Sequence, residues 1–114
     1  MRRTRIKICG LTREEDVDVA VAEGADAIGF VFYPPSPRAI DFGRAEALCR
    51  RIPPFVTTVG LFVNPEPGEV EEGLARLPLG LLQFHGDEDE AFCSRFAHPY
   101  LRAVRMKPGV DLLN

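Results

Sequence analysis

A cysteine at position 9 lies where α/β proteins usually place their chemistry. Residues 6–12 read Ile-Lys-Ile-Cys-Gly-Leu-Thr, which predicts a short strand, a thiol at its end and a glycine that allows a tight exit. Catalytic groups of α/β proteins gather at the carboxyl ends of strands. A thiolate there can act as a nucleophile or a proton acceptor. Cys9 is therefore a candidate catalytic residue, against the equally weighted interpretation of a small buried hydrophobic side chain.

Strand alternation places a cation beside this thiol. Lys7 and Cys9 share one face of the first predicted strand, and Gln83 and His85 share one face of a later strand. Lys7 could supply positive charge next to the thiol or form an ion pair with a carboxylate. His85 could carry a proton or donate a hydrogen bond, and holding a loop in place is an equally good interpretation.

Arg38 is the second candidate for substrate recognition. It ends the stretch 35–38, Pro-Ser-Pro-Arg, directly after an apolar strand. Prolines restrict the loop and reduce the entropy lost when a guanidinium is held in place. The forked donors of arginine suit a carboxylate, whereas the competing interpretation is a solvated loop arginine.

Strand and helix patterns alternate along the whole chain and predict an α/β fold. Hydrogen-bonding residues at Thr12, Asn64 and Asp87 are expected to cap the helices that follow them, with Glu15 and Glu90 completing two capping boxes. The expected strands are 5–9, 27–32, 57–63, 79–84 and 101–105, and the expected helices are 12–24, 41–52, 66–77 and 87–96.

Two architectures fit this alternation of parallel strands and helices. One is an open, doubly wound five-stranded sheet, and the other is an eight-stranded barrel. Strand centres recur about every 24 residues, so a full barrel would need about 190 residues, in keeping with the size of such domains. The polar face that carries Lys7 suits a barrel interior better than a layer beneath a helix, and this favours the barrel.

Composition excludes several classes of function. The chain has 114 residues and a net charge of −3, which gives no electrostatic case for nucleic acid or an anionic membrane as partner. Its apolar runs are shorter than the ~20 residues of a membrane span. Three widely spaced cysteines match neither a disulfide framework nor a zinc site, which favours a reducing cytoplasm. Cys49 and Cys93 lie on apolar helix faces and are expected to be buried.

Four segments together resemble a known family. Residues 7–12, 24–32, 36–38 and 83–86 resemble phosphoribosylanthranilate isomerase, in order and with comparable spacing. Members of that family are single (β/α)₈ barrels of about 200 residues. The resemblance therefore implies that residues 1–114 are one domain, the N-terminal half of such a barrel with about four and a half βα units.

The resemblance also implies an activity in tryptophan biosynthesis. The family carries out an Amadori rearrangement of N-(5-phosphoribosyl)anthranilate to 1-(2-carboxyphenylamino)-1-deoxyribulose 5-phosphate, without a cofactor. The substrate is thus a small sugar phosphate. In this sequence Cys9 takes the place of the family's general base, and Arg38 that of the arginine that binds the anthranilate part. Lys7, Gln83 and His85 are expected to shape the substrate-binding site.

Other parts of the family's machinery have no counterpart in this sequence. The family's general acid is an aspartate at the end of strand six, and its phosphate-binding groups follow strands seven and eight. Asp111 comes too soon after the fifth predicted strand to be that aspartate. We therefore expect little isomerase activity from these residues alone.

Two alternatives to the isomerase stay open from the sequence. The chain could be a non-catalytic half-barrel module that pairs with another copy or with a C-terminal half, because a half barrel exposes strand edges. It could also serve another sugar-phosphate reaction in which Lys7 forms a Schiff base.

Overall fold

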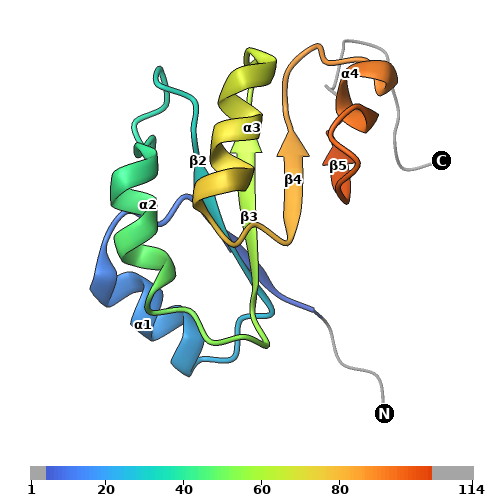
Figure 1. The fold of residues 1–114 in the computed structure, drawn as a ribbon. Helices are drawn as coiled ribbons and strands as arrows, with labels where there is room; N and C mark the ends of the chain where they lie inside the picture. Colours follow the sequence, from blue (N-terminus) through green and yellow to red (C-terminus); the bar gives the residue numbers. More distant parts are fainter. Residues whose placement is uncertain (1–4, 104–114) are drawn as a thin grey trace, which may run out of the picture.

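Strands and helices alternate in the computed structural model, which describes residues 5–103. Figure 1 shows the arrangement. The elements are β1 (Lys7–Cys9), α1 (Glu14–Ala22), β2 (Ala27–Val31), α2 (Phe42–Cys49), β3 (Thr57–Phe62), α3 (Pro67–Arg76), β4 (Leu81–Phe84), α4 (Glu90–Ser94) and β5 (Tyr100–Arg102).

The strands form one parallel sheet in the order β1-β2-β3-β4-β5. A doubly wound sheet reverses its strand order at a switch point. The described strands have no such reversal, so the doubly wound alternative is wrong for this part of the chain. All carboxyl ends lie along one edge, which brings the loops after β1, β2, β3 and β4 together.

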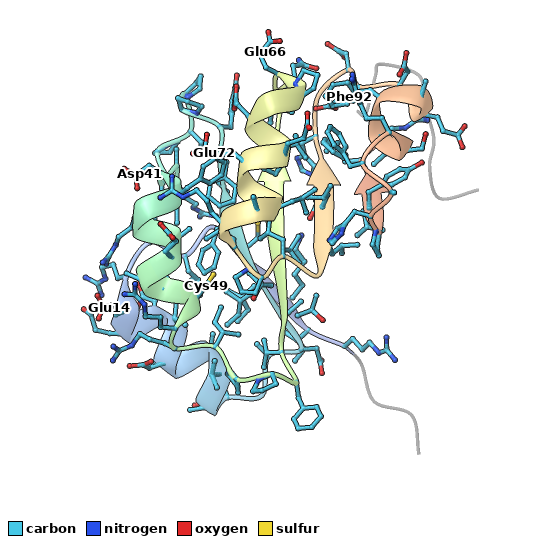
Figure 2. All side chains as sticks on the ribbon, viewed as in Figure 1. Glu14, Asp41, Cys49, Glu66, Glu72 and Phe92 are labelled. Carbon is cyan, nitrogen blue, oxygen red and sulfur yellow. The ribbon has the colours of Figure 1, made fainter. Side chains whose placement is uncertain are left out.

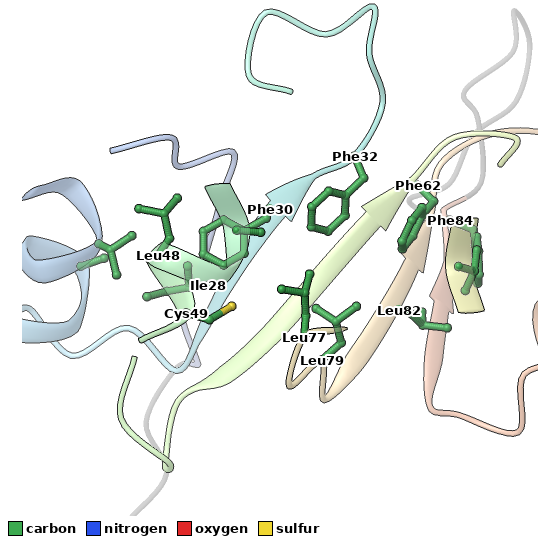
Figure 3. Packing of buried hydrophobic residues seen from close by; sticks show 14 of the residues in the cluster. Ile28, Phe30, Phe32, Leu48, Cys49, Phe62, Leu77, Leu79, Leu82 and Phe84 are labelled. Atoms are coloured by element: carbon green, nitrogen blue, oxygen red, sulfur yellow. The ribbon is translucent and has the colours of Figure 1, made fainter. Parts of the chain in front are cut away.

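The hydrophobic core lies on one face of this sheet, beneath the helices. Phe30, Phe62 and Phe84 come from three neighbouring strands and are fully buried there, as are Ile28 and Leu82. Figure 3 shows these side chains on the same side of the strands. The strand alternation predicted from the sequence therefore places the opposite set of side chains on the face away from the helices.

This second face is apolar at its centre, on β2 and β3. Cys9, Gly29 and Val59 lie in register across β1, β2 and β3. Val59, Val31 and Leu61 are buried, yet they stand apart from the core beneath the helices. A sheet with two apolar faces is typical of parallel strands that are covered on both sides.

Ion pairs join the first two helices. Arg51 contacts Glu14 at 3.0 Å and Asp18 at 2.8 Å, and Arg44 contacts Glu14 at 3.2 Å. Figure 2 shows Glu14 on α1 close to α2. The hydrogen bond from Arg51 lowers the pKa of the Asp18 carboxyl. These exposed pairs orient α1 against α2 and add little stability each.

The predicted cap at Thr12 is wrong. Helix α1 begins after Arg13 and has no side-chain cap. The carbonyl of Thr12 instead accepts hydrogen bonds from the Arg44 guanidinium, at 3.3 and 3.2 Å. Arg44 of α2 thus contacts the segment before α1, and no side chain caps that helix.

The predicted caps at Asn64 and Asp87 are wrong too. Asp89 caps α4 by accepting from the Phe92 amide at 2.8 Å, so the cap lies two residues later than expected. Helix α3 begins after Glu66, with Asn64 outside it at φ 45°. Instead, the Asn64 side chain accepts a hydrogen bond from the Asp87 amide, in the loops beside the cavity described below.

Several element ends also differ from the expectations. Strand β1 begins at Lys7 rather than at residue 5, and α2 ends at Cys49, three residues before Ile52. Strand β4 begins at Leu81, two residues later than expected, although the Gly80 amide before it already donates to the Thr58 carbonyl of β3. Residues 104–114, and with them Asp111 and the end of the fifth predicted strand, lie outside the described residues. Within 5–103, every helix is too short or too polar to cross a membrane.

Candidate active site

A cavity of about 450 Å³ opens at the carboxyl edge of the sheet. It contains three of the five residues that the sequence singled out. Its lining comes from β1, β2, β3 and the loops that follow β1, β2, β3 and β4: Cys9, Gly10, Val31, Tyr33, Ser36, Arg38, Leu61, Val63 and His85.

Two glycines, Gly10 and Gly29, lie beside the Cys9 thiol. Cys9 is half-buried and pairs in register with Gly29, whose carbonyl accepts from the Gly10 amide at 2.9 Å. A Cβ atom at Gly29 would lie 3.0 Å from the sulfur of Cys9. The missing side chain at Gly29 therefore leaves space for the thiol on the inner face.

Gly10 is where the chain turns and where Arg38 packs. Its φ is +88°, in the region that favours glycine, and a Cβ there would lie 2.6 Å from Cδ of Arg38. The Arg38 side chain thus lies directly over the turn that follows Cys9. The predicted turn at Gly10 also allows Arg38 to pack close to Cys9, and both residues line the cavity.

The loop after β2 holds Arg38 at the cavity. Its backbone amide donates to Ser36 Oγ at 3.1 Å, and Ile40 N donates to the Val31 carbonyl at 3.0 Å. Among residues 5–103 the Arg38 guanidinium has no acidic partner. An exposed, unpaired guanidinium beside a thiol is suited to an anionic ligand.

Lys7 and Gln83 lie on the same face, each two residues before a cavity residue of its own segment, and join the site through His85. Lys7 Nζ donates to Gln83 Oε1, and Gln83 Nε2 lies 3.1 Å from His85 Nε2. A Cβ at Gly29 would lie 3.4 Å from Cε of Lys7, so the lysine stem crosses the sheet over this glycine. Lys7 is thus paired with an amide, and within the described part of the chain no carboxylate contacts it.

A buried glutamate fixes the loop after His85, and sequence reasoning did not single it out. Glu88 is 9% exposed and accepts from the amides of Asn64 at 2.7 Å and Gly86 at 2.8 Å. Asn64 Oδ1 in turn accepts from the Asp87 amide at 2.7 Å. We call these four residues the loop clamp. Glu88 stands in an acidic run that is typical of a helix start, which conceals this role.

The other two cysteines are buried, as predicted. Burial raises the pKa of the Cys49 thiol from 9.0 to about 11, and it raises that of Cys93 as well. Figure 2 places Cys49 at the end of α2. Neither thiol forms a thiolate near neutral pH. Residues 5–103 contain no cluster of three or more side chains suited to a metal ion.

Comparison with known proteins identifies the family. The model of the N-(5'-phosphoribosyl)anthranilate (PRA) isomerase family matches residues 6–113. The chain belongs to the PRA isomerase family. A relative of that name from Dechloromonas aromatica is 68% identical over 111 residues, which are 97% of this chain and 53% of the relative.

Solved PRA isomerase structures share the fold. The enzyme from Thermotoga maritima superposes with a TM-score of 0.86 at 41% identity, over 90% of this chain and 51% of that one. A PRA isomerase in complex with reduced 1-(o-carboxyphenylamino)-1-deoxyribulose 5-phosphate also gives a TM-score of 0.86 at 41% identity, over 90% and 54%. The chain thus has the α/β fold of this family, of the TIM-barrel type, and spans about half the length of these relatives.

Proposed function

We propose that residues 1–114 form the N-terminal half of a (β/α)₈ barrel and supply the base of a PRA isomerase. The sequential order of the strands supports this, because a barrel is wound without reversal. The buried apolar side chains on the face away from the helices support it too, since a barrel interior is a packed layer. The matched relatives are about twice as long.

The observation that carries the proposal is the meeting of Cys9 and Arg38 at one cavity. The substrate that the family resemblance implies has a carboxylate on its anthranilate part and a phosphate on its sugar. Arg38 is placed to bind the carboxylate through its forked donors. Cys9 then lies on the sugar side, where a proton must be removed.

The chemistry is an aldose–ketose isomerisation. Opening of the furanose ring by a general acid gives an iminium, and the Cys9 thiolate removes the proton from C2. The electrons of that C–H bond form the C1–C2 enolamine, which tautomerises to the ketone. The acid and the phosphate-binding groups come from the second half of the barrel in this proposal. The described residues thus provide the base and the recognition of the carboxylate.

A Schiff base on Lys7 is less well supported. The Lys7 amine is hydrogen-bonded to Gln83 and is not among the residues that line the cavity. Borohydride trapping with a keto-sugar phosphate would label Lys7 if it were the nucleophile. We expect no label there.

A chimera tests the proposal. Residues 1–114 are joined to the remaining C-terminal part of the Dechloromonas relative, and conversion of the fluorescent substrate is followed. We expect isomerase activity that falls at least about a hundredfold in Cys9→Ser, because a hydroxyl is a far weaker base than a thiolate. Arg38→Met should chiefly raise KM. A folded chimera with an unaffected Cys9→Ser rate would contradict the assignment.

A further inference from the structure

The contacts of Gln83 determine where the proton of a neighbouring histidine lies. Gln83 stands between the Lys7 ammonium and the His85 imidazole. An ammonium has three N–H donors and no acceptor, so the Gln83 carbonyl oxygen must face Lys7. The NH₂ group of the same amide must then face His85.

An amide NH₂ group can only donate, so His85 Nε2 is the acceptor in the 3.1 Å contact. A neutral imidazole carries one N–H, which then lies on Nδ1. We propose that Lys7 and Gln83 are positioning residues that hold His85 as the neutral Nδ1–H tautomer. The histidine that lines the cavity together with Cys9 is thereby a hydrogen-bond donor through Nδ1.

The sheet is built so that Lys7 can reach this far. Lys7 is on β1 and Gln83 is on β4, with two strands between them. The lysine stem passes Gly29, where a Cβ would lie 3.4 Å from Cε. A Cβ at Gly29 would touch this stem, and the glycine leaves room for it. Residues of β1, β2 and β4 thus contribute to the position of one proton.

The second histidine of the chain is an internal reference. His98 Nε2 lies 2.8 Å from the Leu79 carbonyl oxygen. A carbonyl only accepts, so Nε2 of His98 donates and this ring is in the Nε2–H form. The two histidines are therefore expected in opposite tautomers.

A consequence for catalysis rests on the proposed function. A neutral His85 that donates from Nδ1 can bind a substrate oxygen at the cavity while Cys9 removes the proton. In the reverse tautomer its hydrogen would point at Gln83 and away from this task. Lys7 and Gln83 would then influence turnover without touching the substrate.

The tautomers can be read directly by NMR. We would label the histidines of the chain with ¹⁵N and record long-range ¹H–¹⁵N correlations at pH 8.5. We expect the hydrogen on Nδ1 for His85 and on Nε2 for His98. A wild-type His85 ring with its hydrogen on Nε2 would overturn the proposal.

Substitutions separate the two positioning residues. In Gln83→Glu the carboxylate can only accept, so the His85 hydrogen should move to Nε2. In Lys7→Met the amide is free to rotate and both His85 tautomers should appear, whereas Lys7→Arg, which also only donates, should retain Nδ1–H. Arg5→Met, two residues before Lys7 and outside β1, removes a neighbouring exposed cation and is the matched control. An unchanged His85 spectrum in Gln83→Glu or Lys7→Met would overturn the role of that residue.

Kinetic measurements on the chimera test the catalytic consequence separately from the tautomer assignment. The NMR result needs no activity and tests the tautomer alone. If the tautomers are as expected and Lys7→Met also lowers kcat at unchanged folding, the catalytic consequence holds. If the spectra agree but kcat does not change, the catalytic consequence is wrong while the tautomer assignment stands.

Discussion

The three thiols differ in their surroundings, and alkylation should distinguish them. Cys9 lines the cavity, whereas burial raises the pKa of Cys49 to about 11 and that of Cys93 in the same direction. At pH 8 the Cys49 side chain therefore carries about a hundredfold less thiolate than a thiol with the ordinary pKa of 9.0. We expect iodoacetamide to modify Cys9 first, as shown by peptide mass mapping. Cys9→Ser is the control, and rapid labelling of Cys49 in the folded chain would contradict this expectation.

The Cys49 thiol also gives a pH dependence of stability. Its pKa is higher in the folded chain, so the unfolded chain loses its proton first as the pH rises above 9. This contribution to stability is complete below pH 9 and is lost between pH 9 and about 11, by at most about 2.5 kcal/mol. Urea unfolding at several pH values measures it. The slope in this window should be smaller in Cys49→Ala; an identical slope would contradict the account.

Single residues also show the limit of sequence reasoning. Strand alternation correctly placed Lys7 and Cys9 on the face away from the helices, because side-chain direction in a strand is local. It could not show that Lys7 meets Gln83, since that contact depends on how far the sheet curves. The proximity of Arg38 to Cys9 likewise depends on a packing contact over Gly10.

The turn after β1 depends on the positive φ of Gly10, and Arg38 packs against this residue. Gly10→Ala introduces strain at φ +88° and a Cβ 2.6 Å from Cδ of Arg38. Gly24→Ala is a matched control with strain alone, because its φ is +90° and no atom lies within 4 Å of the new Cβ. We expect Gly24→Ala to cost about 1–2 kcal/mol and Gly10→Ala more. In Gly10→Ala, the further change Arg38→Ala should recover the difference, and urea unfolding measures all of these costs.

The loop clamp connects the β3–α3 and β4–α4 loops. Glu88→Ala removes the acceptor of the buried Gly86 amide and of the part-buried Asn64 amide and should cost about 2–4 kcal/mol, whereas Glu88→Gln keeps one acceptor and should cost less. Hydrogen exchange should accelerate at the Asn64 and Gly86 amides in particular. The control is Glu90→Gln on the exposed start of α4. Unchanged exchange at both amides in Glu88→Ala would disprove the clamp.

Element order could be predicted from the sequence and element boundaries could not. The nine elements follow from apolar periodicity, which reflects burial on one face. The predicted caps at Thr12, Asn64 and Asp87 were wrong because several residues near each helix start can accept a hydrogen bond. Tertiary contacts determine which of these residues does so. The loop clamp escaped prediction for the same reason, since it forms only when two loops meet.

At the scale of the whole molecule, the described sheet has two edge strands. In the described residues β1 pairs only with β2, and β5 only with β4. Leu101 on β5 is 51% exposed, which leaves apolar surface at this edge. Open parallel edges are sites of pairing with other chains. We propose that the isolated chain covers them by association with another copy.

Light scattering over a range of concentrations tests this association. We expect a mass above that of one chain, with the excess increasing with concentration. Leu101→Lys should reduce association because a charge at the edge opposes pairing. The exposed Val19 on α1 offers a control, Val19→Lys, far from the sheet edges. A monodisperse monomer that unfolds cooperatively would contradict the prediction.

The central claim is that these residues supply one half of a catalytic barrel, and complementation in trans tests it most directly. The chain is mixed with a separately produced C-terminal half of the Dechloromonas relative, and the decrease in anthranilate-substrate fluorescence is measured. We predict negligible turnover by either half, and activity in the mixture that rises with the concentration of both halves and is abolished by Cys9→Ser. Full activity of the chain alone, or an active mixture that is insensitive to Cys9→Ser, would contradict the claim.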